Sequence, residues 1–186
     1  MSVPQNLLPN YNYADYEMWE GDWELIEGIP YAMAPKPMRR HQSLLGLISM
    51  ELINLFDKCD VYVTVDWKVS SKTVVAPDVA LSCGDDVDER FLSYPPKILF
   101  EILSDSTERK DRNLKFALYE EQKVPYYIMV EPKTLCAEIY KLEGEKYEFT
   151  GEFCGGSFEF SVDGCVKSFD FDRVFRRIKW KEHLHY

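Results

Sequence analysis

Several common signatures are absent from this chain of 186 residues. No uninterrupted apolar run approaches the ~18 residues that indicate a membrane-spanning helix, and the first residues have neither the basic nor the apolar stretch of a secretion signal. We therefore expect a cytoplasmic protein that makes no membrane contact. Glycine-rich phosphate loops, dinucleotide-binding fingerprints and the Gly-x-Ser-x-Gly pattern are also missing, so nothing in the sequence supports those three chemistries.

Cysteine is present, but at no spacing that indicates a metal site. The five cysteines include no Cys-x-x-Cys pair and have no histidine at ligand spacing: Cys59, Cys83, Cys136, Cys154 and Cys165. Their odd number and wide separation predict reduced thiols that pack as small side chains in an intracellular protein. A structural zinc site is therefore not expected.

Positive charge is scarce, because 22 Lys and Arg face 32 Asp and Glu, a formal net charge of −10. A protein that coats DNA with its whole surface is basic instead. Any contact with nucleic acid must come from a local basic patch, or from cations that bridge acidic side chains to phosphate. The charge balance excludes a DNA-coating protein, but it does not exclude a nuclease.

The composition indicates a single folded domain of the mixed α/β class. With 46% hydrophobic and 15% aromatic residues, the chain can bury one core of ordinary size. We expect a polar arm over 1–15, one domain over 16–179 and a short tail over 180–186.

Hydrophobic periodicity predicts the elements of this domain. The first half contains a β-hairpin over 23–33, a helix over 41–56, a strand over 61–69 and an antiparallel strand over 74–82 that Pro77 interrupts. The centre contains a buried strand over 97–103, a helix capped by Asp105 or Ser106 and a second buried strand over 126–130. The last part contains antiparallel strands to 153, a short strand over 158–160 and a basic amphipathic helix from 171. The first helix is expected to expose Gln42, Ser49 and Glu51.

Two acidic residues stand in segments that otherwise indicate buried strand, Asp78 and Glu101. Removing a carboxylate from water costs several kcal/mol unless it is paired or binds a metal. If the two strands are neighbours, both carboxylates can share one hard divalent cation, and oxygen ligands suit Mg²⁺ or Mn²⁺. Alternatively, Asp78 marks a bulge beside Pro77, and Glu101 pairs with an arginine such as Arg109 or Arg112.

A cation for this site has one candidate, Lys115, in the helix that follows the buried strand. Asp111 and Lys115 are four residues apart and could form an exposed pair of ~0.2–0.5 kcal/mol. Alternatively, Lys115 faces the end of the sheet where Glu101 emerges, since Leu114 and Leu118 flank it. His41 opens the first helix and could act as a general base, or it could make a capping or packing contact.

Taken together, the ordered motifs resemble the Uma2 family, formerly a domain of unknown function, over about residues 15–178. The motifs that carry the resemblance are ELIEG at 24–28, His41, PDV at 77–79, FEILSDST at 100–107, the Asp111, Lys115 and Tyr119 series, and VPYYIMVEP at 124–132. Each motif alone has little specificity, but their order and spacing together are specific.

This resemblance implies the PD-(D/E)XK restriction-endonuclease-like superfamily, whose core is a central mixed sheet flanked by helices, here with an extra antiparallel hairpin region. It implies Asp78 and Glu101 as the metal-binding pair. The superfamily's lysine, two residues after the glutamate, is missing, since Leu103 stands there. The resemblance then implies that the lysine has moved to the next helix, as Lys115. Glu24 is either a further carboxylate of the site or an exposed hairpin residue.

The function expected from these residues is a Mg²⁺-dependent endonuclease that hydrolyses phosphodiester bonds of DNA, with a homodimer as one assembly that could cut both strands. The alternative is an inactive module of the same fold that binds nucleic acid or a protein partner. A basic stripe near the C-terminus could contact DNA or pair with an acidic patch: Arg173, Arg176, Arg177, Lys179 and Lys181.

Overall fold

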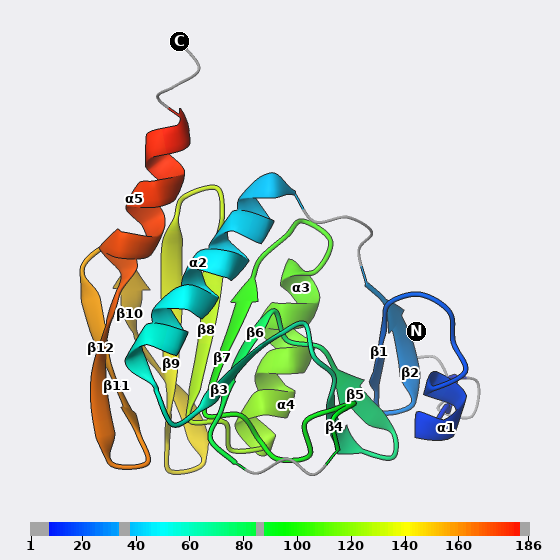
Figure 1. Cartoon of the computed structure of the whole chain (residues 1–186). Coiled ribbons are helices and arrows are strands. Elements are labelled where there is room, and N and C mark those ends of the chain that lie inside the picture. The colour runs from blue at the N-terminus through cyan, green and yellow to red at the C-terminus, as the bar shows by residue number, and fades with distance from the viewer. Residues whose placement is uncertain (1–7, 34–37, 85–87, 183–186) are drawn as a thin grey trace.

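The computed structural model describes residues 8–33, 38–84 and 88–182 (Figure 1). Parts of the predicted arm (1–7) and tail (183–186) lie outside these residues. The centre is a six-stranded mixed sheet whose strands lie in the order β10-β9-β8-β7-β6-β3. Their bounds are β3 Asp60–Val63, β6 Val79–Ser82, β7 Ile98–Ile102, β8 Tyr126–Glu131, β9 Cys136–Glu143 and β10 Lys146–Phe153.

Only β7 and β8 are parallel within this sheet. A parallel pair needs a crossover connection, usually helical. Here the crossover consists of α3 (Glu108–Lys110), a π-helical turn η2 (Asp111–Lys115) and α4 (Phe116–Glu121). The predicted strand–helix–strand unit is therefore confirmed. The helix has Thr107 at its N-cap position with no side-chain cap, so the predicted cap at Asp105 or Ser106 is wrong.

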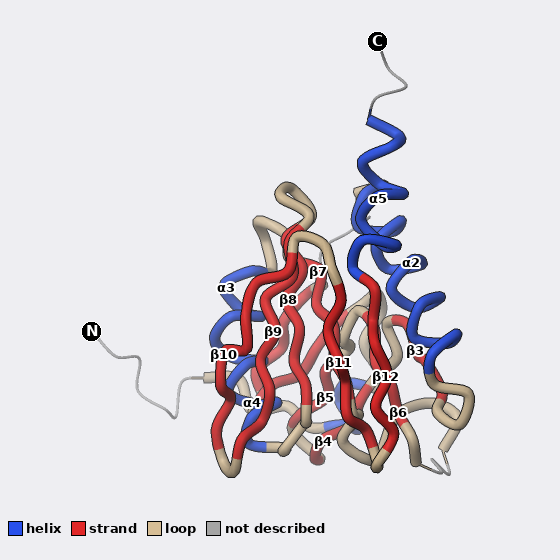
Figure 2. The backbone as a smooth tube through the Cα atoms, turned by 90° about the vertical axis from the view of Figure 1, so that its left-hand side faces the viewer, coloured by secondary structure: helices blue, strands red, loops and turns tan. Residues whose placement is uncertain are grey.

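Helices cover both faces of the sheet. One face packs against α2 (Arg39–Leu55), α5 (Phe171–Glu182) and the hairpin of β11 (Ser157–Val162) and β12 (Cys165–Asp170) (Figures 1 and 2). The other face packs against α4 and a second sheet. Strand β7 shows the alternation, because Ile98, Phe100 and Ile102 join the first core and Leu99 joins the second. Glu101 therefore points toward the second core.

The second sheet has the order β2-β1-β5-β4. Its strands are β1 Trp23–Ile26, β2 Ile29–Ala32, β4 Trp67–Ser70 and β5 Thr73–Val75, and the one-turn helix α1 (Tyr13–Tyr16) lies beside β1 (Figure 1). The hairpin turn has positive φ at both Glu27 (51°) and Gly28 (79°), as a two-residue hairpin turn requires. The hairpin predicted over 23–33 is confirmed.

The long strand predicted over 61–69 is two strands in different sheets. Thr64 has a positive φ of 49°, which ends β3 and sends the chain into β4. The strand predicted over 74–82 is also divided in two, at Pro77. As a result β5 pairs with β4 and β6 pairs with β3, both antiparallel. The antiparallel pairing was correctly predicted. The single continuous strand was wrong, because a residue with positive φ does not change the alternation of apolar and polar residues.

Helix α2 has a wider buried surface than its periodicity predicts. Ser49 and Glu51 are buried, whereas Gln42 is exposed as expected. The burial arises because α5 packs against α2, where Arg173 pairs with Glu51 at 3.3 Å. The Ser49 hydroxyl donates to the Leu45 carbonyl at 2.7 Å.

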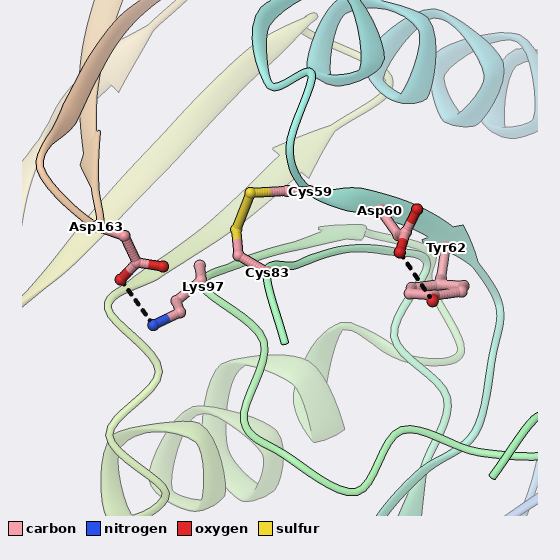
Figure 3. The surroundings of a disulfide bond; sticks show 6 residues. All are labelled: Cys59, Asp60, Tyr62, Cys83, Lys97 and Asp163. Atoms are coloured by element: carbon pink, nitrogen blue, oxygen red, sulfur yellow. Dashed lines mark hydrogen bonds and ion pairs between the residues drawn. A yellow bond between two sulfur atoms is a disulfide. The ribbon is translucent and has the colours of Figure 1, made fainter. Parts of the chain in front are cut away.

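The expectation of reduced cysteines is wrong for four of the five. Disulfides join Cys59 to Cys83 and Cys136 to Cys154, while Cys165 is free and exposed. Figure 3 shows the first of them beside β3. The cause is register: the pairing of Asp60 with Ser82 and of Phe153 with Ala137 sets the flanking cysteines opposite each other. Separations of 24 and 18 residues along the chain conceal this adjacency.

None of the helices in the described ranges combines the length and the apolar character needed to cross a membrane.

Candidate active site

Strands β6 and β7 bring the two predicted carboxylates together. Val79 pairs with Phe100 in the antiparallel register, so Asp78, which directly precedes β6, lies opposite Glu101. Asp78 Oδ2 accepts a hydrogen bond from the Ile102 amide at 2.7 Å. The predicted adjacency of the two strands is therefore confirmed, and the position of Asp78 between two sheets brings its side chain to the end of β7.

Lys115 lies inside this cluster rather than on the surface. Its Nζ is 2.8 Å from Glu101 Oε1, 2.7 Å from Glu24 Oε1 and 3.7 Å from Asp111 Oδ1. The side chains of Lys115 and Asp111 are only 3% and 2% exposed. The exposed surface pair considered for these two residues is thus excluded, and Lys115 faces Glu101.

The part of the crossover helix that faces the sheet includes the π-helical turn. Asp111, Lys115 and Tyr119 are buried, whereas Leu114 is 42% exposed. The expectation that flanking leucines would turn Lys115 inward is therefore wrong for Leu114. Single π-helical turns are rare, but those that occur are often located at functional sites. Arg112 does not bind Glu101, because its guanidinium forms two hydrogen bonds to Glu138 at 2.7 and 2.8 Å.

Glu24 comes from β1 of the second sheet and is fully buried, so it is not an exposed hairpin residue. Its Oε1 accepts from the Ala76 amide at 3.0 Å, and its Oε2 binds Lys110 Nζ. Lys110 was not singled out in the sequence, because it stands in the charged string ERKDR, which is typical of a solvated helix start. Glu24, from the second sheet, therefore contacts both Lys110 and Lys115 of the crossover helix.

His41 lies at the start of α2, with Nε2 3.3 Å from Asp78 Oδ2. Burial would lower the pKa of this imidazole, but the hydrogen bond and charge of Asp78 raise it overall. Its Nδ1 is buried and has no hydrogen-bond partner in the described part of the chain. The structure therefore brings Glu24, Glu101 and Lys115 into direct contact. It places the pair of His41 and Asp78 at the end of β7, where Asp78 accepts from the amide of the residue after Glu101.

Tyr119 extends this network one helical turn beyond Lys115. Its hydroxyl donates to Glu101 Oε1 at 2.9 Å, and its ring stacks on Trp67 with centroids 5.8 Å apart. Tyr127, in the neighbouring strand β8, donates to the Asp111 carbonyl at 3.1 Å. The four-residue spacing from Lys115 is the one sequence signal that could have placed Tyr119 beside Glu101.

Negative charge exceeds positive charge in this cluster, and the pKa values respond. Burial raises the pKa of Glu101 well above its usual range, although Lys115 opposes the shift. Burial also raises the pKa of Asp111. For Glu24 burial acts in the same direction, but Lys115 and Lys110 lower its pKa overall. Burial would lower the pKa of Lys115, yet the carboxylates of Glu101 and Glu24 raise it. Lys115 therefore stays charged.

The carboxylate oxygens of this site are the kind of ligand that a hard divalent cation prefers. Among the described residues, the hydrogen bonds and ion pairs of the Asp78 side chain fall on Oδ2 and those of Glu101 fall on Oε1, so each keeps a second oxygen for a ligand. Asp111 Oδ1 is buried without a hydrogen bond. In the described ranges these carboxylates do not form a tight group of three ligand atoms. Mg²⁺ commonly takes one or two carboxylates and keeps several waters, which matches the Asp78 and Glu101 pair.

Solvent reaches the edge of the network through a small pocket of about 170 Å³. Its lining combines the hairpin residues Tyr31 and Ala32 with Ser106, Thr107 and Lys110 at the start of the crossover helix. Lys110, which binds Glu24, therefore connects the pocket to the buried carboxylates.

Comparison with known proteins agrees with this architecture. The central mixed sheet flanked by helices is the fold class expected from the sequence. The chain matches the model of the Uma2 family, described as "putative restriction endonuclease", over residues 13–156. The match covers more than half of the chain, and the protein belongs to the Uma2 family.

Individual proteins also resemble the chain. An uncharacterized protein of Synechocystis sp. is 28% identical over 148 residues, which cover 74% of this chain and 77% of that protein. A crystal structure from Anabaena variabilis, titled a putative nuclease belonging to DUF820, superposes with a TM-score of 0.70 at 12% identity. That match covers 89% of this chain and 97% of the other. At such low identity it establishes the shared fold alone.

Proposed function

We propose that this protein is a Mg²⁺-dependent DNA endonuclease in which Asp78 and Glu101 hold the metal, with Mn²⁺ as a substitute. The observation that carries the proposal is the buried contact between Lys115 and Glu101, with Asp78 opposite on the neighbouring strand. Lys115 supplies the positive charge that the strand itself lacks, since Leu103 occupies the position two residues after Glu101. The family match to restriction endonucleases supports the same chemistry.

The residues of the network have distinct parts in this proposal. When bound, a divalent cation supplies an activated water and part of the positive charge that phosphodiester hydrolysis requires. Lys115 holds its ammonium group beside Glu101, where it orients the water or neutralises the phosphate. Glu24 keeps Lys115 charged and in place, and Lys110 binds the other oxygen of Glu24. His41, through its contact with Asp78, positions that carboxylate and can accept a proton.

A groove on the α2 and α5 side of the sheet, with three basic side chains among its lining residues, can receive the phosphate backbone. It measures about 920 Å³ and lies between α2 and α5, where Gln42 and Ser43 directly follow His41. Arg173 and Arg176 pair with the acidic residues Glu51 and Asp172. Arg177 and Lys179 border the groove and have no acidic partner in the described residues. The side chain of Lys181 lies outside those residues.

Reversing the two groove charges, with the double variant Arg177→Glu/Lys179→Glu, should weaken DNA binding. Each lost phosphate contact removes ~0.9 from the slope of log affinity against log salt, so the slope should decrease by up to ~2. Fluorescence anisotropy of a labelled duplex at several salt concentrations measures both effects. The control variant Lys123→Glu/Lys146→Glu changes the net charge equally at the far end of the molecule. Equal weakening by both variants would contradict a specific groove contact.

The test of the proposed activity is conversion of supercoiled plasmid by the wild-type protein. We expect nicked product with Mg²⁺ or Mn²⁺, no product with excess EDTA, and recovery when Mg²⁺ is restored. One chain offers one network and cuts one strand, so a linear product requires two chains, as in a homodimer. Binding of the plasmid without cleavage under all these conditions would instead support the alternative, an inactive nuclease-fold module.

A further inference from the structure

A second cluster of metal-ligating side chains lies on β9 and β10, apart from the carboxylate network. Sγ of Cys136 and Sγ of Cys154, which are joined in the second disulfide, and a carboxylate oxygen of Glu152 lie within 4.8 Å of one another. This is the one such group of three in the described ranges. Cys154 and Glu152 are exposed, so an ion from solvent can reach them.

Strand geometry creates the cluster. Phe153 pairs with Ala137 and Glu152 with Glu138, so Cys154 lies opposite Cys136. Residues two apart on a strand point to the same face, which places Glu152 and Cys154 side by side on one strand. The three donors therefore come from two rigid neighbouring strands, and no loop has to close to bring them together.

The local charge favours a cation at this place. Glu131 pairs across β8 and β9 with Cys136, and Glu138 pairs with Glu152, so two further glutamates border the cysteines. Glu138 is already bound by Arg112. Glu152 has no hydrogen bond or ion pair to any described residue and remains free to act as a ligand.

We propose that Cys136, Cys154 and Glu152 form a binding site for Zn²⁺ when the disulfide between the two cysteines is reduced. Zinc takes thiolate and carboxylate ligands in four-coordinate geometry, and three protein ligands leave one position for water. Soft thiolate ligands select such a metal over Mg²⁺. The site is independent of the proposed nuclease network, because it shares no residue with it.

The exchange needs an external dithiol as the reductant. A dithiol reductant transfers two electrons and two protons to the disulfide: the S–S bond breaks, two thiols form, and the dithiol closes to its own disulfide. Binding of Zn²⁺ then displaces the two thiol protons to solvent. A disulfide oxidant then accepts two electrons from the two thiolates and is reduced to two thiolates of its own, the Cys136–Cys154 bond forms again, and the metal is released.

Cobalt absorption spectroscopy tests the proposal on the full chain. The background variant Cys59→Ser/Cys83→Ser/Cys165→Ser leaves only the pair of interest. After reduction with a dithiol and desalting without oxygen, Co²⁺ should produce the thiolate charge-transfer band and the visible bands of tetrahedral cobalt at one equivalent. Zn²⁺ should abolish them stoichiometrically. The same protein in its oxidised form should show neither band.

Two variants of that background make the test decisive. Cys154→Ser should lose the charge-transfer band, with circular dichroism verifying that the protein is folded. Glu152→Gln changes an exposed residue and should weaken Co²⁺ affinity by at least ~10-fold, the scale for loss of even a supporting residue. No band in the reduced background protein would overturn the proposal. An unchanged affinity in Glu152→Gln would overturn the three-ligand site.

Discussion

The Asp78→Asn variant is expected to lose metal-dependent cleavage while retaining its stability. Loss of a charged metal ligand removes several kcal/mol of transition-state stabilisation, which corresponds to more than a ~100-fold decrease in rate. The asparagine oxygen can still accept the Ile102 amide that Asp78 Oδ2 binds. Removing one negative charge beside Glu101 also relieves repulsion in the metal-free protein. Plasmid cleavage and urea unfolding, measured on the same preparation, test both expectations.

Asp60→Asn is a suitable control, because Asp60 lies on the neighbouring strand β3 and is exposed outside the network. It should change neither the cleavage rate nor the unfolding midpoint. A loss of several kcal/mol of unfolding free energy in Asp78→Asn would assign Asp78 to structure. Retained cleavage in that variant would remove it from the metal site.

Lys115→Met should have the largest effect on stability. The substitution leaves the buried carboxylates of Glu24, Glu101 and Asp111 without the ammonium group that all three contact. Breaking a buried ion pair by removing one partner costs ~3–5 kcal/mol. Cleavage should be lost as well, because Lys115 is the cation nearest to Glu101. Urea unfolding at neutral pH measures the change in free energy.

The pair of Lys115 and Glu24 can be isolated by a double-mutant cycle. Glu24→Gln removes one of the uncompensated charges, so Glu24→Gln/Lys115→Met should be less destabilised than the sum of the single variants. Lys146→Met is the control, because Lys146 pairs with Glu120 on the surface and such pairs contribute ~0–1 kcal/mol. A Lys115→Met protein as stable as this control would contradict the buried network.

Much of this architecture follows from local patterns. The hairpin, the long helix α2, the buried strands β7 and β8 and the helix between them all have strong periodicity or turn residues. Asp78 and Glu101 are recognisable because an acidic residue in an apolar strand requires a partner. Their proximity follows once consecutive strands are taken as neighbours. These features depend on residues close together in the chain.

The features that sequence reasoning missed depend on register or on helix rotation. Leu114 was expected to pack inward beside Lys115 but is exposed, and no residue type marks the π-helical turn that contains it. Lys110 contacts Glu24 only because a second sheet delivers that carboxylate. The cysteine pairs arise from the register of two antiparallel ladders. Such contacts between distant segments are determined by tertiary packing, which local periodicity does not encode.

The central claim is that Asp78, Glu101 and Lys115 form a metal-dependent nuclease centre. Cleavage of supercoiled plasmid by wild-type protein and by Glu101→Gln, titrated with Mg²⁺ and Mn²⁺, tests it most directly. Glutamine has the same size and still accepts hydrogen bonds from Lys115 and Tyr119, so only the charge is lost. We expect cleavage by the wild type that EDTA stops, and none by Glu101→Gln at any metal concentration. Equal cleavage by both proteins, or none by the wild type, would contradict it.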